Sequence, residues 1–553
     1  MKNRKMVIGM LLALLISIGL LAACGRADEP APAPVDPAAP ATPAPPAAAT
    51  PAPAPEQPAP GEEVVLITRV TADMRGWIPN HMVDDPGFGI HQNMYHRLIQ
   101  LDMSHSVIPQ LSHTWTVSED GLTITFYLRD DVYWHDGVQV TSADVQYTFL
   151  TIRDNLSYVR SPELQVIDDI TTPDDFTAVF HLTHPDVGLI GTLAWYGVFV
   201  LPQHVLDVGV PWGENPLNTE GGMIGSGPFM YDWQQIGVGT SIIANPNYAD
   251  GRPRIDRIFY QIIPDMATAV EALIAGDIDH LAGVAPADRE RLLAMPGIDI
   301  HEWVFPSPHR VHMRIDREPF DDVNVRRALA MTLPRQDMSE RIFLGLNPPE
   351  YTMYPSVVEW VACFDSLAPT QDIQGARDLL AASGYVEDAD GFFIRDVEFM
   401  VFSTGLWPDQ GRMIEAAARE GGIELVLNIV DSAAWSDQVG VARDYQIAMQ
   451  GGYMGPDPTA MNAIVGTGGS RNHMGFSCEQ VDYYLMRAGS VGDLEERAYW
   501  YRKVWARLAE ELVHIPTVQS ISFEATTSRL RNRPIEGTGR WGWASWAFAY
   551  FAD

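Results

Sequence analysis

Residues 114–128 read TWTVSEDGLTITFYL and hold the clearest secondary-structure signal in the chain. The pair Asp120-Gly121 is a strong short-range signal for a hairpin turn. Beyond it, apolar residues alternate with Thr and Tyr from Leu122 to Leu128, which is the period of a half-buried strand. These features predict a β-hairpin over 114–128.

Helix signals alternate with further strands along the rest of the chain. The run Thr141–Asp144 has the form of a capping box, in which the first and fourth side chains satisfy backbone groups at a helix start. We predict further helices that begin at Asp265 and close at Gly276, begin at Asp321 or Asp322, cover Ala376–Leu380 and end at Gly384, and follow the apolar face from Leu494 to Leu512. Expected strands cover Val64–Val70, Ile255–Ile263, Val397–Phe402 and Glu424–Ile429. Such alternation predicts an α/β protein, and 553 residues are too many for one core, so two or three domains are expected.

The charge of the chain excludes several functions. Lys+Arg total 37 and Asp+Glu total 71, so the formal net charge is −34, which opposes binding to nucleic acid. Its only lysines are Lys2, Lys5 and Lys503. Because Lys503 has no glycine loop beside it, neither a phosphate-binding P-loop nor a Schiff-base lysine is expected.

The first residues predict an export signal. Lys2, Arg4 and Lys5 precede an apolar stretch from Met6 to Leu21, and small residues then lead to Cys24. This order resembles a bacterial lipoprotein signal, in which cleavage before the cysteine is followed by attachment of lipid to its sulfur. An ordinary signal peptide and an uncleaved anchor are the alternatives.

A proline-rich spacer follows Cys24. Between Pro30 and Pro60 there are 13 prolines in 31 residues, mostly interleaved with alanine. Proline fixes φ and donates no backbone hydrogen bond, so this segment should form an extended tether that reaches roughly 95 Å. The folded part is expected to begin near Glu62.

Searches for a catalytic or metal site give no positive signal. There is no Gly-x-Ser-x-Gly elbow and no zinc-protease helix, and the run Asp388–Gly391 lacks calcium ligands at both ends of its loop. Cys363 and Cys478 either form one disulfide or remain two free thiols, since sequence cannot show their proximity. We therefore expect no enzyme activity, no cofactor and no metal.

Four blocks of sequence carry a resemblance to a known family. They are Tyr95–Phe149, with Trp134-His135-Asp136-Gly137; Gly225–Asp279, with Gly225-Ser226-Gly227-Pro228-Phe229; Pro319–Leu329; and Gly452–Pro458, followed by the helix Asp493–Leu512 and by His514-Ile515-Pro516. In this order and spacing they resemble the family 5 extracellular solute-binding proteins of peptide and nickel ABC importers.

The resemblance implies a two-lobed, clamshell fold of the type II periplasmic-binding-protein kind. The implied division is 1–23 signal peptide, 24–61 tether, 62–97 first part of lobe I, 98–200 inserted subdomain of lobe I, 201–308 second part of lobe I, 309–513 lobe II, and 514–553 C-terminal part of lobe I. It also implies hinge closure on a trapped peptide and delivery to a membrane permease with a separate ATPase. The protein would be a monomer outside the cytoplasm that touches the membrane through its lipid anchor alone and binds no nucleic acid.

The ligand is the least determined feature. Peptide binders of this family carry an Asp after the Gly-Trp of the fourth block, which pairs with the free amine of the peptide. Here Gly452-Tyr453 stands for Gly-Trp, the Asp position falls on Pro456, and Asp457 follows one residue later. An oligosaccharide or another non-peptide solute is therefore an alternative, as are a peptide-sensing receptor and a secreted hydrolase.

Candidate ligand contacts are mostly aromatic, because a neutral ligand such as an oligosaccharide would bind on flat aromatic platforms, whereas an extended peptide could be held by backbone hydrogen bonds. They are Trp435, Tyr453, Asp457, Gln450, Phe88, Trp541 and Trp543, with Trp546 in the same C-terminal stretch. Phe88 is expected in a loop after the first strand.

Overall fold

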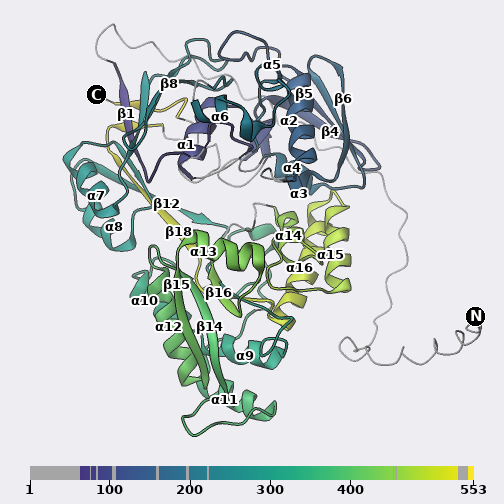
Figure 1. Cartoon of the computed structure of the whole chain (residues 1–553), viewed down its shortest axis with the longest axis vertical. Helices are drawn as coiled ribbons and strands as arrows, with labels where there is room; N and C mark the ends of the chain where they lie inside the picture. Colours follow the sequence, from purple (N-terminus) through teal and green to yellow (C-terminus); the bar gives the residue numbers. More distant parts are fainter. Residues whose placement is uncertain are drawn as a thin grey trace, which may run out of the picture. The chain divides into compact units, whose positions relative to one another are not determined.

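The computed structural model describes residues 63–552, except 75, 82–84, 102–106, 157, 159–160, 195–197, 221–222, 366, 452–453, 455–456 and 533–545. Its strands form a seven-stranded, a five-stranded and a four-stranded sheet and two two-stranded pairs (Figure 1). We call lobe I the part that contains the seven-stranded and four-stranded sheets, and lobe II the part that contains the five-stranded sheet.

Lobe I is built on a mixed sheet of seven strands. In spatial order they are β12 (Ile298–Phe305), β18 (Ser520–Thr527), β11 (His280–Ala282), β1 (Val65–Val70), β10 (Arg257–Ile262), β9 (Gly239–Ala244) and β8 (Phe229–Gln235). β1 lies parallel to both β10 and β11, while the other neighbours are antiparallel. Strands from the start, the middle and the end of the chain therefore share one sheet.

A four-stranded antiparallel sheet forms the second part of lobe I. Its order is β4 (Ser112–Val117), β5 (Thr123–Leu128), β7 (Thr177–Leu182) and β6 (Ile167–Asp174). β4 and β5 are the hairpin expected from sequence, and Gly121 in its turn has φ +68°, a backbone conformation that glycine adopts without strain. Two short pairs complete the lobe, β2 (Ile99–Leu101) with β3 (Val107–Pro109) and β19 (Leu530–Arg531) with β20 (Tyr550–Phe551).

Lobe II contains a five-stranded sheet. Its order is β15 (Ile423–Val430), β14 (Ile394–Phe402), β16 (Ile447–Gln450), β13 (Arg310–Met313) and β17 (His514–Pro516). β14 is parallel to both of its neighbours, whereas β13 is antiparallel to β16 and β17. The expected strands near 397–402 and 424–429 are confirmed within β14 and β15.

Helices cover the sheets of both lobes. Those of lobe I are α1 (Asp85–Met94), α2 (Ser142–Asp154), α3 (Ser161–Leu164), α4 (Gly188–Leu193), α5 (Gln203–Leu206), η1 (Trp212–Glu214), α6 (Leu217–Glu220), α7 (Met266–Ala275) and α8 (Pro286–Leu293). Those of lobe II are α9 (Val323–Thr332), α10 (Arg335–Ile342), η2 (Glu359–Val361), α11 (Ile373–Ala382), α12 (Trp407–Glu420), α13 (Ser432–Trp435), η3 (Ser436–Ala442), η4 (Pro458–Ala460), α14 (Met461–Val465), α15 (Glu479–Gly489) and α16 (Leu494–Glu511).

The helix starts expected from sequence are present. The Asp144 carboxylate accepts from the Thr141 backbone at 2.9 Å, and the Asp265 carboxylate accepts from Thr268 N. Asp322, rather than Asp321, caps α9. Local hydrogen bonds of this kind depend on few residues, so sequence predicts them well.

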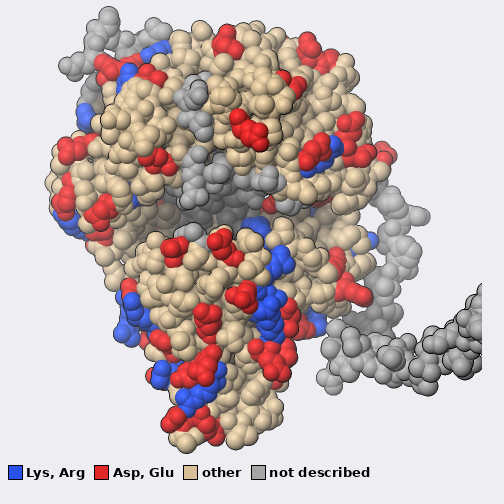
Figure 2. Space-filling view, in the orientation of Figure 1, with Lys and Arg blue, Asp and Glu red and all other residues tan. Residues whose placement is uncertain are grey.

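The two lobes have separate hydrophobic cores. The largest buried cluster of lobe I runs from Leu66 to Ala549, with a smaller one from Ile263 to Ala525, and the largest cluster of lobe II runs from Val311 to Val518, with a smaller one from Met400 to Ala448. On the face drawn in Figure 2, acidic side chains are scattered over both lobes and basic ones gather mainly on lobe II. Separate cores allow each lobe to move as one body.

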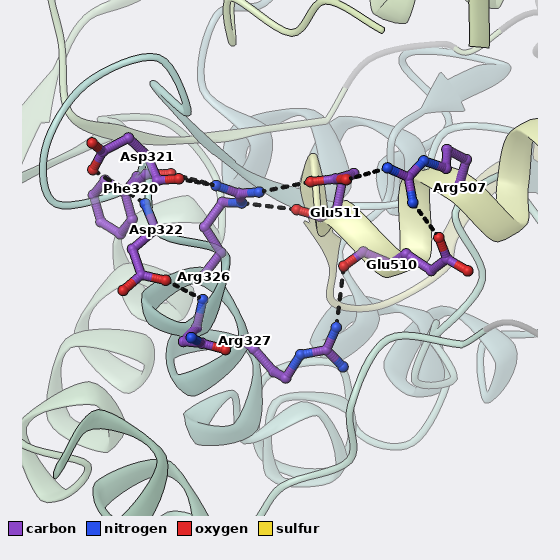
Figure 3. A network of polar contacts seen from close by, with 9 residues as sticks. Phe320, Asp321, Asp322, Arg326, Arg327, Arg507, Glu510 and Glu511 are labelled. Carbon is purple, nitrogen blue, oxygen red and sulfur yellow. Dashed lines mark hydrogen bonds and ion pairs between the residues drawn. The ribbon is translucent and has the colours of Figure 1, made fainter. Parts of the chain in front are cut away.

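A network of arginines ties two helices of lobe II together (Figure 3). The Arg326 guanidinium donates to the carbonyls of Phe320 at 2.6 Å and Glu511 at 2.8 Å, and its side chain is only 4% exposed. Arg507 pairs with Glu511 at 2.7 Å from the same helix. Arg326 therefore supplies donors to the C-terminal end of α16, where helix carbonyls lack partners of their own.

We expect Arg326→Met to lower the free energy of unfolding of lobe II by about 3 kcal/mol, because it leaves the carbonyls of Phe320 and Glu511 without their guanidinium donor. Urea denaturation followed by far-UV circular dichroism measures this. The control is Arg341→Met. Arg341 pairs with Asp337 at 3.8 Å, and the two side chains are 70% and 58% exposed. This substitution should therefore lower the free energy of unfolding by less than about 0.5 kcal/mol. Equal losses for the two variants would contradict the role of the network.

Candidate ligand cleft and hinge

The chain crosses between the lobes twice, and the two crossings are hydrogen-bonded to each other. Residues 306–309 join β12 to β13, and residues 517–519 join β17 to β18. His309 N donates to Val518 O at 2.9 Å, and Thr517 N donates to His309 O at 2.8 Å. Two short crossings of this kind form a hinge, because a few residues can absorb a rotation of one lobe against the other.

The crossings belong to one antiparallel ribbon that runs through both lobes. Phe305 pairs with Ser520 on the lobe I side, and Arg310 pairs with Pro516 on the lobe II side. The first crossing therefore has four residues (306–309) against three in the second (517–519). One extra residue on one strand is the feature that defines a β-bulge, which bends and twists a ribbon locally. The change of direction between the lobes thus coincides with this irregularity.

Buried imidazoles and a guanidinium surround the hinge on the lobe II side. Arg310 Nε donates to His312 Nε2 at 2.7 Å, and both side chains are buried. Burial lowers the pKa of His514 to about 3 and that of His309 to about 4, with the Arg310 charge acting in the same direction. Burial and Arg310 also hold the pKa of His312 well below its ordinary value. All three histidines are thus neutral at pH 7.

Two described residues at the start of the fourth sequence region, Gly451 and Met454, lie against this hinge. The His309 ring stacks on the Trp407 indole with 4.2 Å between centroids, and a Cβ at Gly451 would lie 2.8 Å from Cη2 of that indole. Met454 N donates to Pro306 O at 3.1 Å. Gly451 therefore lets the backbone approach Trp407 closely, and the Met454 backbone is hydrogen-bonded to the first crossing.

The Asp457 carboxylate forms its hydrogen bonds and its ion pair with residues of lobe II. Its carboxylate accepts from Thr459 N at 2.9 Å and Thr459 Oγ1 at 2.6 Å, and it pairs with Arg497 Nη2 at 2.8 Å. Thr459 Oγ1 also lies 2.9 Å from the Tyr501 hydroxyl. The Arg497 side chain is only 10% exposed, so its charge needs this carboxylate.

Similarity to known proteins identifies the family of the chain. The profile of the bacterial extracellular solute-binding proteins, family 5 (Middle), matches residues 106–472. The chain belongs to this family. Its two-lobed fold, mixed sheets and hinge are therefore those of an extracellular solute-binding protein.

Two relatives and one solved structure show the extent of the similarity. The oligopeptide-binding protein AppA of Bacillus subtilis is 25% identical over 449 residues, which is 78% of this chain and 81% of that protein. Heme-binding protein A of Haemophilus influenzae is 23% identical over 468 residues, which is 80% of this chain and 84% of that protein. The structure of AppA in complex with a nonapeptide superimposes with a TM-score of 0.78 at 21% identity, over 89% of this chain and all of that one.

The aromatic candidates in this family 5 protein occupy different environments. Trp435 is 6% exposed and stacks on Phe402 with 4.9 Å between ring centroids. Phe88 lies in α1 rather than in a loop, is fully buried and packs beside Phe199. Gln450 ends β16, where its backbone pairs with Arg310 at the hinge. The structure thus brings Gln450 to the hinge and packs Trp435 and Phe88 against neighbouring side chains.

Other candidates lie outside the described residues. These are Cys24 with the tether, Tyr453, Trp541 and Trp543. Trp546 is described and buried, and its ring meets His280 edge-on at 5.0 Å.

The disulfide alternative for Cys363 and Cys478 is wrong, because both thiols are free. Cys478 sits at the start of α15 and Cys363 follows η2, and each packs separately against the core of lobe II.

One contact between the lobes was not predicted from the sequence. α4 of lobe I packs against η4 of lobe II, and Val187 N donates to Gly489 O at 3.0 Å. The signal that could have indicated it is the pair Gly188 and Gly191, three residues apart and so on one helix face.

The described part of the chain contains neither a metal-binding cluster nor a membrane-spanning helix. No group of three or more His, Cys, Asp or Glu side chains there could hold a metal ion. No helix in that part is both long and apolar enough to cross a membrane.

The neutral histidines of the hinge predict an acid-sensitive structure. Their native pKa lies below the unfolded value of about 6.5, so the unfolded chain binds more protons in acid and the free energy of unfolding falls as the pH decreases from about 6.5 towards 4. Each fully shifted histidine contributes roughly 1.4 kcal/mol per pH unit in this range.

His514→Gln, which keeps a side-chain donor, should make this decrease shallower. His113→Gln, at an exposed position on β4, should leave it unchanged. Denaturation curves at several pH values test this. Parallel pH profiles for wild type and His514→Gln would refute it.

Proposed function

We propose that this family 5 protein is the substrate-binding receptor of an ABC importer. In this proposal it captures oligopeptides or dipeptides by hinge closure and delivers them to a membrane permease, with no catalysis of its own. The observation that carries the proposal is the double crossing at 306–309 and 517–519, which links two lobes with separate cores. Closure on a ligand requires this arrangement, because a ligand shifts the equilibrium only by binding the closed state more tightly.

The proposed location is the outer face of the cell membrane. A lipid on Cys24 would hold the protein, and the tether of residues 24–61 would keep its acidic domain away from the anionic surface. Without the signal segment the formal charge becomes 34 − 71 = −37, because Lys2, Arg4 and Lys5 are removed.

Within the folded part, we propose the lobe boundaries expected from sequence, except that the second crossing lies at 517–519 instead of near 514, because β17 (His514–Pro516) belongs to the sheet of lobe II. In this division α4 belongs to the inserted subdomain of lobe I. Gln450, Trp435 and Tyr453 remain proposed ligand contacts, together with the C-terminal Trp541 and Trp543, whereas the buried Phe88 is a core residue of lobe I.

The similarity to AppA supports a peptide as the ligand. That relative is named as an oligopeptide-binding protein, and its structure holds a nonapeptide. Backbone hydrogen bonds to an extended chain would give affinity without recognition of particular side chains.

A non-peptide solute is the second candidate, and one specific observation favours it. The Asp457 carboxylate is already neutralised by Arg497, so it is poorly placed to pair with a peptide amine. The similarity to heme-binding protein A shows that a relative of comparable identity is named for a different ligand.

The ligand is best identified by native mass spectrometry of the protein as purified, followed by calorimetry with peptide mixtures. Retention or binding of peptides supports the proposal. Failure to bind any peptide, together with tight binding of a sugar or a metal chelate, would replace the peptide assignment.

Two other functions are distinguished in simple ways. A sensory receptor would be encoded beside a membrane sensor rather than beside permease and ATPase genes. A hydrolase would turn over substrate in an activity screen of the purified protein.

We expect that acetylation of a bound peptide's N-terminus changes its dissociation constant by less than about threefold, because Asp457 is committed to Arg497. Calorimetry with matched free and acetylated peptides measures this. A charge-assisted hydrogen bond contributes roughly 1.5–3 kcal/mol, so a loss of tenfold or more would show that a carboxylate does bind the amine.

A further inference from the structure

Away from the hinge, the lobes meet where α4 lies against η4. Leu189 and Leu193 of α4 belong to the core of lobe I, whereas Met461 and Ile464, which follow η4, belong to the core of lobe II. Each side of the contact is thus fixed to its own lobe, and rotation about the hinge must bring the two sides together or separate them.

The contact requires glycine on the α4 side. A Cβ at Gly188 would lie 2.0 Å from Thr459 Cγ2 and 2.2 Å from its Cβ, and a Cβ at Gly191 would lie 3.2 Å from the Cβ of Asp457. Gly188 is helical with no left-handed φ, so its backbone conformation does not demand glycine. The close approach of Thr459 is what requires glycine at this position.

The lobe II side is rigid. Thr459 is held by hydrogen bonds to Asp457 and Tyr501, and Asp457 is held by Arg497 of α16. The Val187 N to Gly489 O hydrogen bond adds a directional contact from the end of α15. Three elements of lobe II thus form a seat of fixed shape for the first turn of α4.

The contact is small enough to open. A crevice of about 460 Å³ lies beside it, lined from lobe I by His184, Pro185 and Asp186 and from lobe II by residues that include Asp482 and Met486. Burial raises the pKa of Asp186, so closing the contact takes a carboxylate partly out of water at a cost in free energy. Such a contact can stabilise the closed state without making closure permanent.

We propose that α4 and η4 form a latch between the lobes, in which Gly188 and Gly191 seat on Thr459 and Asp457 when the cleft closes. This inference rests on the proposed hinge closure. It assigns Asp457 and Arg497 to holding the lobes together rather than to the ligand, and it makes the closed population depend on residues that do not contact the ligand.

The test is an engineered disulfide across the latch, Gly191→Cys with Asp457→Cys, in the full chain. The Cβ separation of 3.2 Å is slightly below the roughly 3.5–4.5 Å of disulfides, so a small adjustment allows the bond. The single variants Gly191→Cys and Asp457→Cys control for loss of each native residue. Mass spectrometry of peptide digests locates the bond and separates it from Cys24, Cys363 and Cys478.

We expect three results from the double variant. It forms the disulfide on mild oxidation, and a saturating peptide identified by native mass spectrometry speeds its formation by at least about tenfold, because the ligand populates the closed state. The oxidised form has a smaller radius of gyration by X-ray scattering than the reduced form. It also releases bound peptide at least about tenfold more slowly, and reductant restores release.

The outcomes separate this inference from the proposed function. If no peptide binds but the disulfide forms and compacts the protein, the peptide assignment fails and the latch stands. If peptide binds but the disulfide does not form, or forms without changing release, the latch is wrong.

Gly188→Ala gives an independent test. It should weaken binding of the same peptide by at least about tenfold and increase the radius of gyration, because Thr459 occupies the space its Cβ needs. The matched control is Gly492→Ala, where no atom lies within 4 Å of the added Cβ and no left-handed φ occurs. Equal affinity in the two variants would overturn the proposal, provided that their melting temperatures agree.

Discussion

The backbone pairing of His309 with Thr517 and Val518 is the constraint on which the rest of the structure depends. Because these hydrogen bonds join the two crossings, the lobes share one antiparallel ribbon, from β12 and β18 in lobe I to β13 and β17 in lobe II. The ribbon belongs to both sheets and so transmits the position of one sheet to the other. Its extra residue between 306 and 309 places the irregularity at the point where the lobes must rotate. A hinge of paired strands limits sliding while it permits bending, which restricts the motion to closure.

The chemistry around the ribbon fits a fixed pivot. Arg310, His312 and His514 are buried beside it, and burying several cationic groups together would oppose folding. Keeping the imidazoles neutral removes most of that cost and lets His312 accept the Arg310 hydrogen bond. The stacking of His309 on Trp407 then couples the first crossing to α12. The pivot is therefore built from packing, neutral imidazoles and the buried Arg310 guanidinium, while exposed ion pairs such as those of Arg395 lie elsewhere.

Sequence was informative where structure depends on near neighbours. The Asp120-Gly121 turn, the cap at Asp265 and the helix end at Gly276 involve residues a few positions apart, and all are present. It was less informative where distant segments decide the environment. Phe88 was expected in a loop because glycines flank it, yet packing against Phe199 places it in a buried helix. Trp435 has the residue type of a ligand platform, but its stacking on Phe402 from β14 appears only after folding. The seat for α4 joins residues near 188 with residues near 459, 489 and 501, and the Gly188/Gly191 pair marks the α4 side alone without indicating its partner.

The position of Asp457 links ligand choice to closure. The family's peptide binders place a carboxylate one residue earlier, where this chain has proline, and a carboxylate at 457 reaches Arg497 of α16 instead. Once paired there, it orders Thr459, and the ordered Thr459 shapes the seat that admits only glycine from α4. A carboxylate engaged in that network cannot also turn towards the cleft without leaving Arg497 buried and unpaired, at a cost of roughly 3–5 kcal/mol. That free-energy cost exceeds the stabilisation that a single amine contact contributes. In this proposal the ligand is therefore held by groups other than Asp457. In this arrangement the shift of one residue moves a carboxylate from ligand recognition to holding the lobes together.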